Sequence, residues 1–113
     1  MHELSIMQSA LSQALDQAQR AGAVRVHQIR LKIGALSGVV PEALEFAFEA
    51  LADGTAAQGA TLTIENVPAR FWCENCHREF EAPGMFSDCP DCNRPSGDLR
   101  AGRELELASM EVD

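Results

Sequence analysis

Apolar residues recur with a helical period in two segments of the chain. Over residues 4–19 they return at spacings of three and four, which predicts an amphipathic helix that ends at Gly22. Its expected buried stripe is Leu4, Met7, Leu11, Ala14, Leu15 and Ala18. Pro41 suits the first turn of a second helix, and Gly54 is its expected stop. The buried stripe expected for this second helix is Leu44, Ala47, Phe48 and Leu51.

Between these helices, apolar residues recur at every second position, the period of a strand. Within residues 24–35, apolar and charged side chains alternate, which predicts a strand that buries Ile29, Leu31 and Ile33. Val24 and Val26 fall on the opposite parity from these three. A bulge or bend is therefore expected near His27 and Gln28.

Two further strands are predicted by alternation at residues 61–65 and 104–107, and Pro68 ends the first of them. The simplest arrangement returns the last strand to the first sheet. The predicted fold class is α+β, with a small three-stranded sheet and two helices over residues 1–69 and 101–113. Residues 70–100, which hold all four cysteines, are predicted to form an inserted zinc-ribbon-like domain.

The composition restricts the partners. The chain has 113 residues and a formal net charge of −8, from 17 acidic and 9 basic residues. This balance argues against nucleic acid and anionic membranes, and it is compatible with protein partners or a cation cargo. No apolar run reaches membrane-spanning length, and the N-terminus is polar, so a cytoplasmic protein is expected.

The four cysteines form two Cys-x-x-Cys pairs separated by residues 77–88. Each pair directs two sulfurs to one point, and two pairs can close a tetrahedron of thiolates, the preferred shell of Zn²⁺. Because the protein fills every position, the expected metal is structural. The expected zinc ligands are Cys73, Cys76, Cys89 and Cys92.

Other interpretations of the cysteines are weaker or remain open. Disulfides are unexpected in a cytosolic chain, and a thioredoxin-like site needs one pair instead of two. Iron suits the same four sulfurs. Zinc ribbons also serve as nucleic-acid-binding or protein-interaction modules, which is the alternative function. His77, directly after Cys76, is expected to be an exposed turn residue, with a role as a metal ligand as the minority interpretation.

The opening tripeptide Met1-His2-Glu3 carries a second candidate metal site. Because His2 is bulky, Met1 should be retained with a free α-amine. That amine, the His2 amide nitrogen and imidazole Nδ1, and the Glu3 amide nitrogen can place four nitrogens in a plane, which suits Ni²⁺ or Cu²⁺. Taken alone, the tripeptide is better explained as a frayed terminus with an exposed histidine. A helix that starts at Leu4 would anchor the site.

These features together resemble a known family. The start Met1-His2-Glu3-Leu4-Ser5, the segment Leu31-Lys32-Ile33-Gly34-Ala35-Leu36-Ser37 and the paired cysteines occur in the order typical of the HypA/HybF hydrogenase-maturation nickel metallochaperones. The resemblance covers nearly the whole chain.

The resemblance implies Ni(II) as cargo and structural Zn(II). It implies delivery of nickel to the [NiFe]-hydrogenase large subunit with a HypB-type nickel GTPase as partner, and urease maturation proteins as further partners of some relatives. It implies that His2 is the essential nickel ligand and that Met1 and Glu3 contribute backbone ligands, with Glu3 also in partner contact. Neither nucleic acid nor membrane is an expected partner.

Two rival classes of protein would depend on particular residues of this chain. A nucleic-acid-binding ribbon would use the aromatic residues near the cysteines, although these are expected to form a small core. An enzyme needs an open metal position, so no enzymatic activity is expected. The glutamates at helical spacing, Glu42, Glu45 and Glu49, are expected to form a solvated face, and His27 to lie on the strand surface or its edge.

Overall fold

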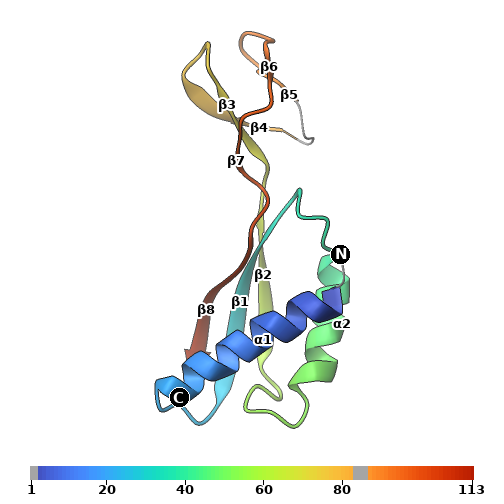
Figure 1. The fold of residues 1–113 in the computed structure, drawn as a ribbon, viewed down its shortest axis with the longest axis vertical. Helices are drawn as coiled ribbons and strands as arrows, with labels where there is room; N and C mark the ends of the chain where they lie inside the picture. The colour runs from blue at the N-terminus through green and yellow to red at the C-terminus, as the bar shows by residue number, and fades with distance from the viewer. Residues whose placement is uncertain (1–2, 83–86) are drawn as a thin grey trace. The chain divides into compact units, whose positions relative to one another are not determined.

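The computed structural model describes residues 3–82 and 87–113 (Figure 1). The chain divides into two compact units. The first unit comprises Met1–Lys32, Val39–Glu65 and Glu106–Asp113, and the second comprises Ile33–Gly38 and Asn66–Leu105. Compared with the domains expected from composition, the second unit also takes in residues 33–38, 66–69 and 101–105.

The secondary structure has the predicted order. The two helices and the three strands of the larger sheet are α1 (Glu3–Arg20), β1 (Val26–Gly34), α2 (Pro41–Ala52), β2 (Thr61–Val67) and β8 (Leu105–Val112). The strand order in this sheet is β2-β1-β8, so the last strand of the chain pairs with the first. The predicted three-stranded sheet with two helices is confirmed.

Helix α1 begins at Glu3, one residue before the predicted start, and packs against α2. It buries side chains at spacings of four, three and four, namely Met7, Leu11, Ala14 and Ala18. Leu4, expected to belong to this stripe, is 52% exposed. The prediction was wrong there, and the buried stripe starts almost one turn later, at Met7.

Strand β1 starts at Val26, two residues later than expected, and Val24 is exposed. Val26 and Ile29 are both buried although an odd number of positions separates them. The parity of burial therefore changes where a bulge or bend was predicted. Beyond that point the alternation holds, with Ile29, Leu31 and Ile33 buried.

Helix α2 has Pro41 in its first turn, as predicted. It buries Leu44, Ala47, Phe48 and Ala52, whereas Leu51 is only half-buried. Val40 occupies the N-cap position in an extended conformation, and its apolar side chain provides no capping hydrogen bond. Ala43, at the third position of the helix, offers no side-chain acceptor either, so the Val40 amide needs one from elsewhere.

The second unit contains two small sheets. One has the order β4-β3-β7, from Arg78–Glu81, Arg70–Cys73 and Leu99–Ala101, and the other pairs β5 (Ser87–Asp88) with β6 (Pro95–Ser96). Phe71 and Phe80 are opposite each other in the β3–β4 register, with stacked rings whose centroids are 5.9 Å apart. The core of this unit is Ala69, Phe71, Cys73, Phe80 and Cys89.

Two glycines meet where β1 ends. A Cβ placed on Gly34 would lie 2.1 Å from the backbone carbon and oxygen of Gly102, so only glycine fits there. Gly34 N donates to Glu104 O at 2.8 Å, and Leu36 N donates to Gly102 O at 2.7 Å. This close approach of two backbones holds residues 34–36 within the second unit.

Candidate metal centre

Two turns of similar geometry present the four cysteines. Cys73 ends β3, and its carbonyl accepts a hydrogen bond from His77 N at 2.8 Å. Cys89 follows β5, and its carbonyl accepts one from Asn93 N, also at 2.8 Å. His77 and Asn93 both have positive φ, 54° and 61°, directly after the second cysteine of each pair. The two Cys-x-x-Cys segments therefore form equivalent turns.

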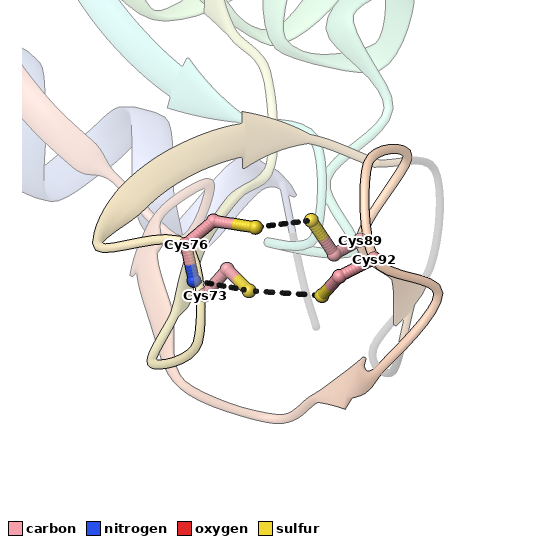
Figure 2. Close-up of side chains that lie close together, drawn as sticks. All are labelled: Cys73, Cys76, Cys89 and Cys92. Carbon is pink, nitrogen blue, oxygen red and sulfur yellow. Dashed lines mark hydrogen bonds between the residues drawn. The ribbon is translucent and has the colours of Figure 1, made fainter.

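The sulfurs of Cys73, Cys76, Cys89 and Cys92 converge on one point (Figure 2). All four Sγ atoms lie within 4.8 Å of one another. The Sγ atoms of Cys73 and Cys92 are 3.6 Å apart, and those of Cys76 and Cys89 are 3.9 Å apart. A tetrahedral zinc with Zn–S bonds of 2.3 Å requires S–S edges of about 3.8 Å. The donor set therefore fits zinc in both chemistry and spacing.

The spacing also bears on the alternatives for these cysteines. None of the four forms a disulfide, and the shortest of these sulfur separations far exceeds the bond length of about 2.05 Å. The same tetrahedron suits iron in its geometry. Within the part of the chain that the structure describes, the cluster contains cysteines alone, and His77 is exposed on its turn.

The surroundings change the pKa values of three thiols in opposite directions. Burial, and then hydrogen bonding to the other cysteines, raises the pKa of Cys76 to about 12. Backbone hydrogen bonds, with Cys92 and with Arg94 respectively, lower the pKa of Cys89 and that of Cys92. The Asn75 side chain also contributes to the lowered pKa of Cys92. Backbone amides thus stabilise negative charge on the second pair, which assists a cation in binding there.

A polar network holds the segment after the second cysteine pair against β3. Ser96 Oγ donates to Trp72 O at 2.6 Å, and Trp72 N donates to Asp98 O at 2.9 Å. The Arg100 guanidinium lies 4.9 Å from the centre of the Trp72 ring and donates two hydrogen bonds to the Asp98 carboxylate. These bonds lower the pKa of Asp98. The network braces both cysteine turns.

The aromatic residues near the cysteines serve mainly as core. Phe71 and Phe80 are buried, as expected, and Trp72 is half-buried with its indole Nε1 donating to Glu74 at 3.0 Å. The His77 ring meets the Trp72 ring edge-on. The four-cysteine cluster of this unit therefore packs with a small aromatic core.

The second candidate site is described only in its third residue, because Met1 and His2 lie outside the described residues. Glu3 is the first residue of α1, and its Oε2 accepts a hydrogen bond from Val40 N at 3.1 Å. In a capping box, a glutamate three residues into a helix accepts the N-cap amide of the same helix. Here a glutamate from α1 does so for α2.

Sequence reasoning missed this link between Glu3 and Val40. One signal was present: the third position of α2 is Ala43 and not a glutamate or glutamine, so no capping box within α2 accepts the Val40 amide. Sequence reasoning also missed the part that Asn75 plays at the sulfur cluster.

None of the helices within the described residues combines the length and apolar character that crossing a bilayer requires.

The fold and the sulfur cluster define a small α+β protein with a four-cysteine metal site. The family model described as "Hydrogenase/urease nickel incorporation, metallochaperone, hypA" matches residues 1–112. The chain therefore belongs to the HypA family of nickel metallochaperones.

Similar proteins agree with this assignment. Hydrogenase maturation factor HypA from Picosynechococcus sp. is 46% identical over 112 residues, which cover 99% of each chain. The protein of the same name from Rhizobium leguminosarum bv. viciae is 41% identical, again over 99% of each chain. The solution structure of the Ni metallochaperone HypA from Helicobacter pylori matches 99% of this chain and 97% of that one, with a TM-score of 0.67 and 22% identity. Another HypA solution structure gives a TM-score of 0.72 at 22% identity. These two structures support the fold.

Proposed function

We propose that the protein carries Ni(II) on Met1-His2-Glu3 and delivers it to the [NiFe]-hydrogenase large subunit in the cytoplasm. A HypB-type GTPase is its proposed partner in the transfer, and urease maturation proteins are a second set of recipients. The protein acts in this scheme as a carrier and catalyses no reaction. Membership of the nickel-incorporation family supports the cargo, and the anchoring of Glu3 supports the site.

The proposed ligands are the Met1 α-amine, the His2 amide and Nδ1, and the Glu3 amide. Four nitrogens in a square plane suit nickel, a d⁸ ion. Glu3 lies in the first turn of α1, where amide groups have no acceptor within the helix. Nickel can therefore use the Glu3 nitrogen without breaking the helical ladder.

The hydrogen bond from Val40 to Glu3 is the observation that most favours this site. It joins the third residue of the tripeptide to the N-cap of α2, so that residue is fixed from two helices. A chelate whose last donor is held in place loses less conformational entropy on binding than one on a loose tail. The Glu3 carboxylate acts in this arrangement as an anchor for the tripeptide.

We further propose that Cys73, Cys76, Cys89 and Cys92 hold structural zinc. Thiolates in a closed tetrahedron favour Zn²⁺, whereas nickel prefers the planar nitrogen set. The two metals are therefore sorted by donor type and geometry. Zinc would bind both turns and maintain the second unit, and it would leave no open coordination position for catalysis.

Release of nickel follows from the proposed donors. The amide nitrogens bind only after they lose their protons, and an imidazole with its ordinary pKa of about 6.5 takes up a proton in mild acid. Nickel affinity should therefore fall steeply from pH 8 to pH 5. A partner that distorts the square plane of nitrogens on docking would also weaken their bonds to nickel and release the ion. An affinity that stays constant over this pH range would contradict the proposed ligand set.

Nickel titration of untagged protein tests the site. The wild type should bind one nickel with the absorption of a square-planar complex, whereas His2→Ala and a variant with one extra N-terminal residue should lose it. Metal analysis of the same samples should find one zinc and no iron in all three, which shows that the second unit is intact. Nickel bound equally by all three proteins would reject the terminal site, and iron in place of zinc would reject the zinc assignment.

A further inference from the structure

The solvent face of α2 carries an aromatic side chain among glutamates. Phe46 is 77% exposed, although phenylalanine is usually buried. Three glutamates near it are also exposed. Glu42 lies four residues before Phe46, Glu45 one residue before it and Glu49 three residues after it. At 100° per residue, all four side chains fall within about 100° of the helix circumference. We call these four residues the Phe46 face.

The structure pairs none of the three glutamates of this face with a basic side chain among the residues that it describes. Helix α2 contains no basic residue. Across residues 3–82 and 87–113, no salt bridge joins Glu42, Glu45 or Glu49 to a cation, whereas acidic residues elsewhere are paired, such as Asp16 with Arg20. Three glutamates on one helix face repel one another, so the face is available to a cationic surface.

We propose that the Phe46 face binds a partner protein that offers an apolar pocket for the Phe46 ring within a rim of lysine and arginine. Aromatic side chains at the centre of a charged surface are common binding hot spots because a complementary pocket excludes water from them. Opposite charges around the pocket speed the encounter and select the partner. The occupant proposed here is the GTPase of the nickel transfer, so the inference rests on the proposed function.

The position of α2 makes this face suitable for nickel transfer. The N-cap residue of the same helix, Val40, donates the hydrogen bond that anchors Glu3, so the start of α2 contacts the third residue of the proposed nickel tripeptide. Glu42 lies in the first turn of α2. A partner bound along the Phe46 face would thus dock on the helix that supports the nickel site.

Titration of the purified HypB-type GTPase against Phe46→Ala tests the anchor. The dissociation constant should rise at least tenfold relative to wild type. Val24→Ala is the matched control, because Val24 is also 77% exposed but lies outside α2, and it should bind within twofold of wild type. Both variants should keep the wild-type melting temperature, nickel content and zinc content, since both side chains are exposed.

A second comparison tests the charges. The pair Glu45→Gln and Glu49→Gln should slow association with the GTPase about tenfold at low salt and flatten its salt dependence. The pair Glu106→Gln and Glu111→Gln removes the same charge from exposed positions of β8 and should leave the association rate nearly unchanged.

Three outcomes would overturn the inference. Equal binding by wild type and Phe46→Ala would place the GTPase on another surface, while normal nickel loading in the same samples would leave the carrier function intact. Failure of the wild type to bind the GTPase would remove the occupant. Self-association of the wild type that Phe46→Ala abolishes would make this face an interface between two copies of the chain.

Discussion

The carboxylate of Glu3 accepts a hydrogen bond from the backbone amide of Val40, 37 residues further along the chain. The N-cap amide of helix α2 thereby obtains the acceptor that Ala43, at the third position of that helix, cannot supply. The same bond fixes the first residue of α1. A negative charge at the start of both helices is also favourable, because it interacts with the positive ends of their dipoles. One side chain thus stabilises two helix ends and the third residue of the proposed nickel site.

Glu3→Ala should remove this cap, whereas Glu3→Gln should keep an oxygen that can accept the bond. We expect the alanine variant to lose about 1 kcal/mol of stability and the glutamine variant less. The Val40 amide resonance should shift in Glu3→Ala and stay near its wild-type position in Glu3→Gln. An unchanged Val40 resonance in the alanine variant would show that the bond is absent in solution.

Cys76→Ser should release zinc and disorder the second unit while the first stays folded. Loss of one thiolate leaves three ligands, and structural zinc contributes about 10–16 kcal/mol in comparable small modules. Trp72 is the only tryptophan in the chain and lies beside Cys73, so its fluorescence reports on this unit alone. Its emission should move to the red, while the helical circular dichroism of α1 and α2 should persist. Full zinc occupancy in this variant would contradict the four-sulfur shell.

Zinc binding should release protons at neutral pH. Because the pKa of Cys76 is raised to about 12, this thiol is protonated at pH 7 in the metal-free protein and must lose its proton to bind zinc. Raising the pH removes this competition, so zinc affinity should increase with pH and fall in acid. Calorimetric titrations in buffers of different ionisation enthalpy measure the released protons. Identical heats in all buffers would contradict this prediction.

Gly34→Ala should be strongly destabilising because its Cβ would collide with the Gly102 backbone, which cannot rotate away. We expect a loss of about 3 kcal/mol or more in urea unfolding. Gly38→Ala is the matched control in the following loop. A Cβ there meets open space, and only the positive φ of 79° is unfavourable, at about 1 kcal/mol. Equal losses in both variants would argue against the close approach of the two backbones.

Much of the fold was predictable because its signals are local. A helix or strand exposes one face along its own length, so the periods of three to four and of two located α1, α2 and β1 within one or two residues. The cysteine turns are equally local, since two residues between cysteines place both sulfurs on one side. The glutamates of α2 were correctly assigned to solvent by the same spacing, as was His27, which is exposed on β1.

Other features were decided only by how the elements pack. Leu4 fits the apolar stripe of α1 yet is exposed, because periodicity specifies a face of a helix but not how far its partner extends. The bond from Val40 to Glu3 and the contact of Gly34 with Gly102 join residues far apart in the chain. The amino-acid order therefore determined the elements and the four sulfur donors. Tertiary packing alone decided which helix end anchors Glu3 and which backbone excludes a side chain at Gly34, because both depend on distances between separate elements.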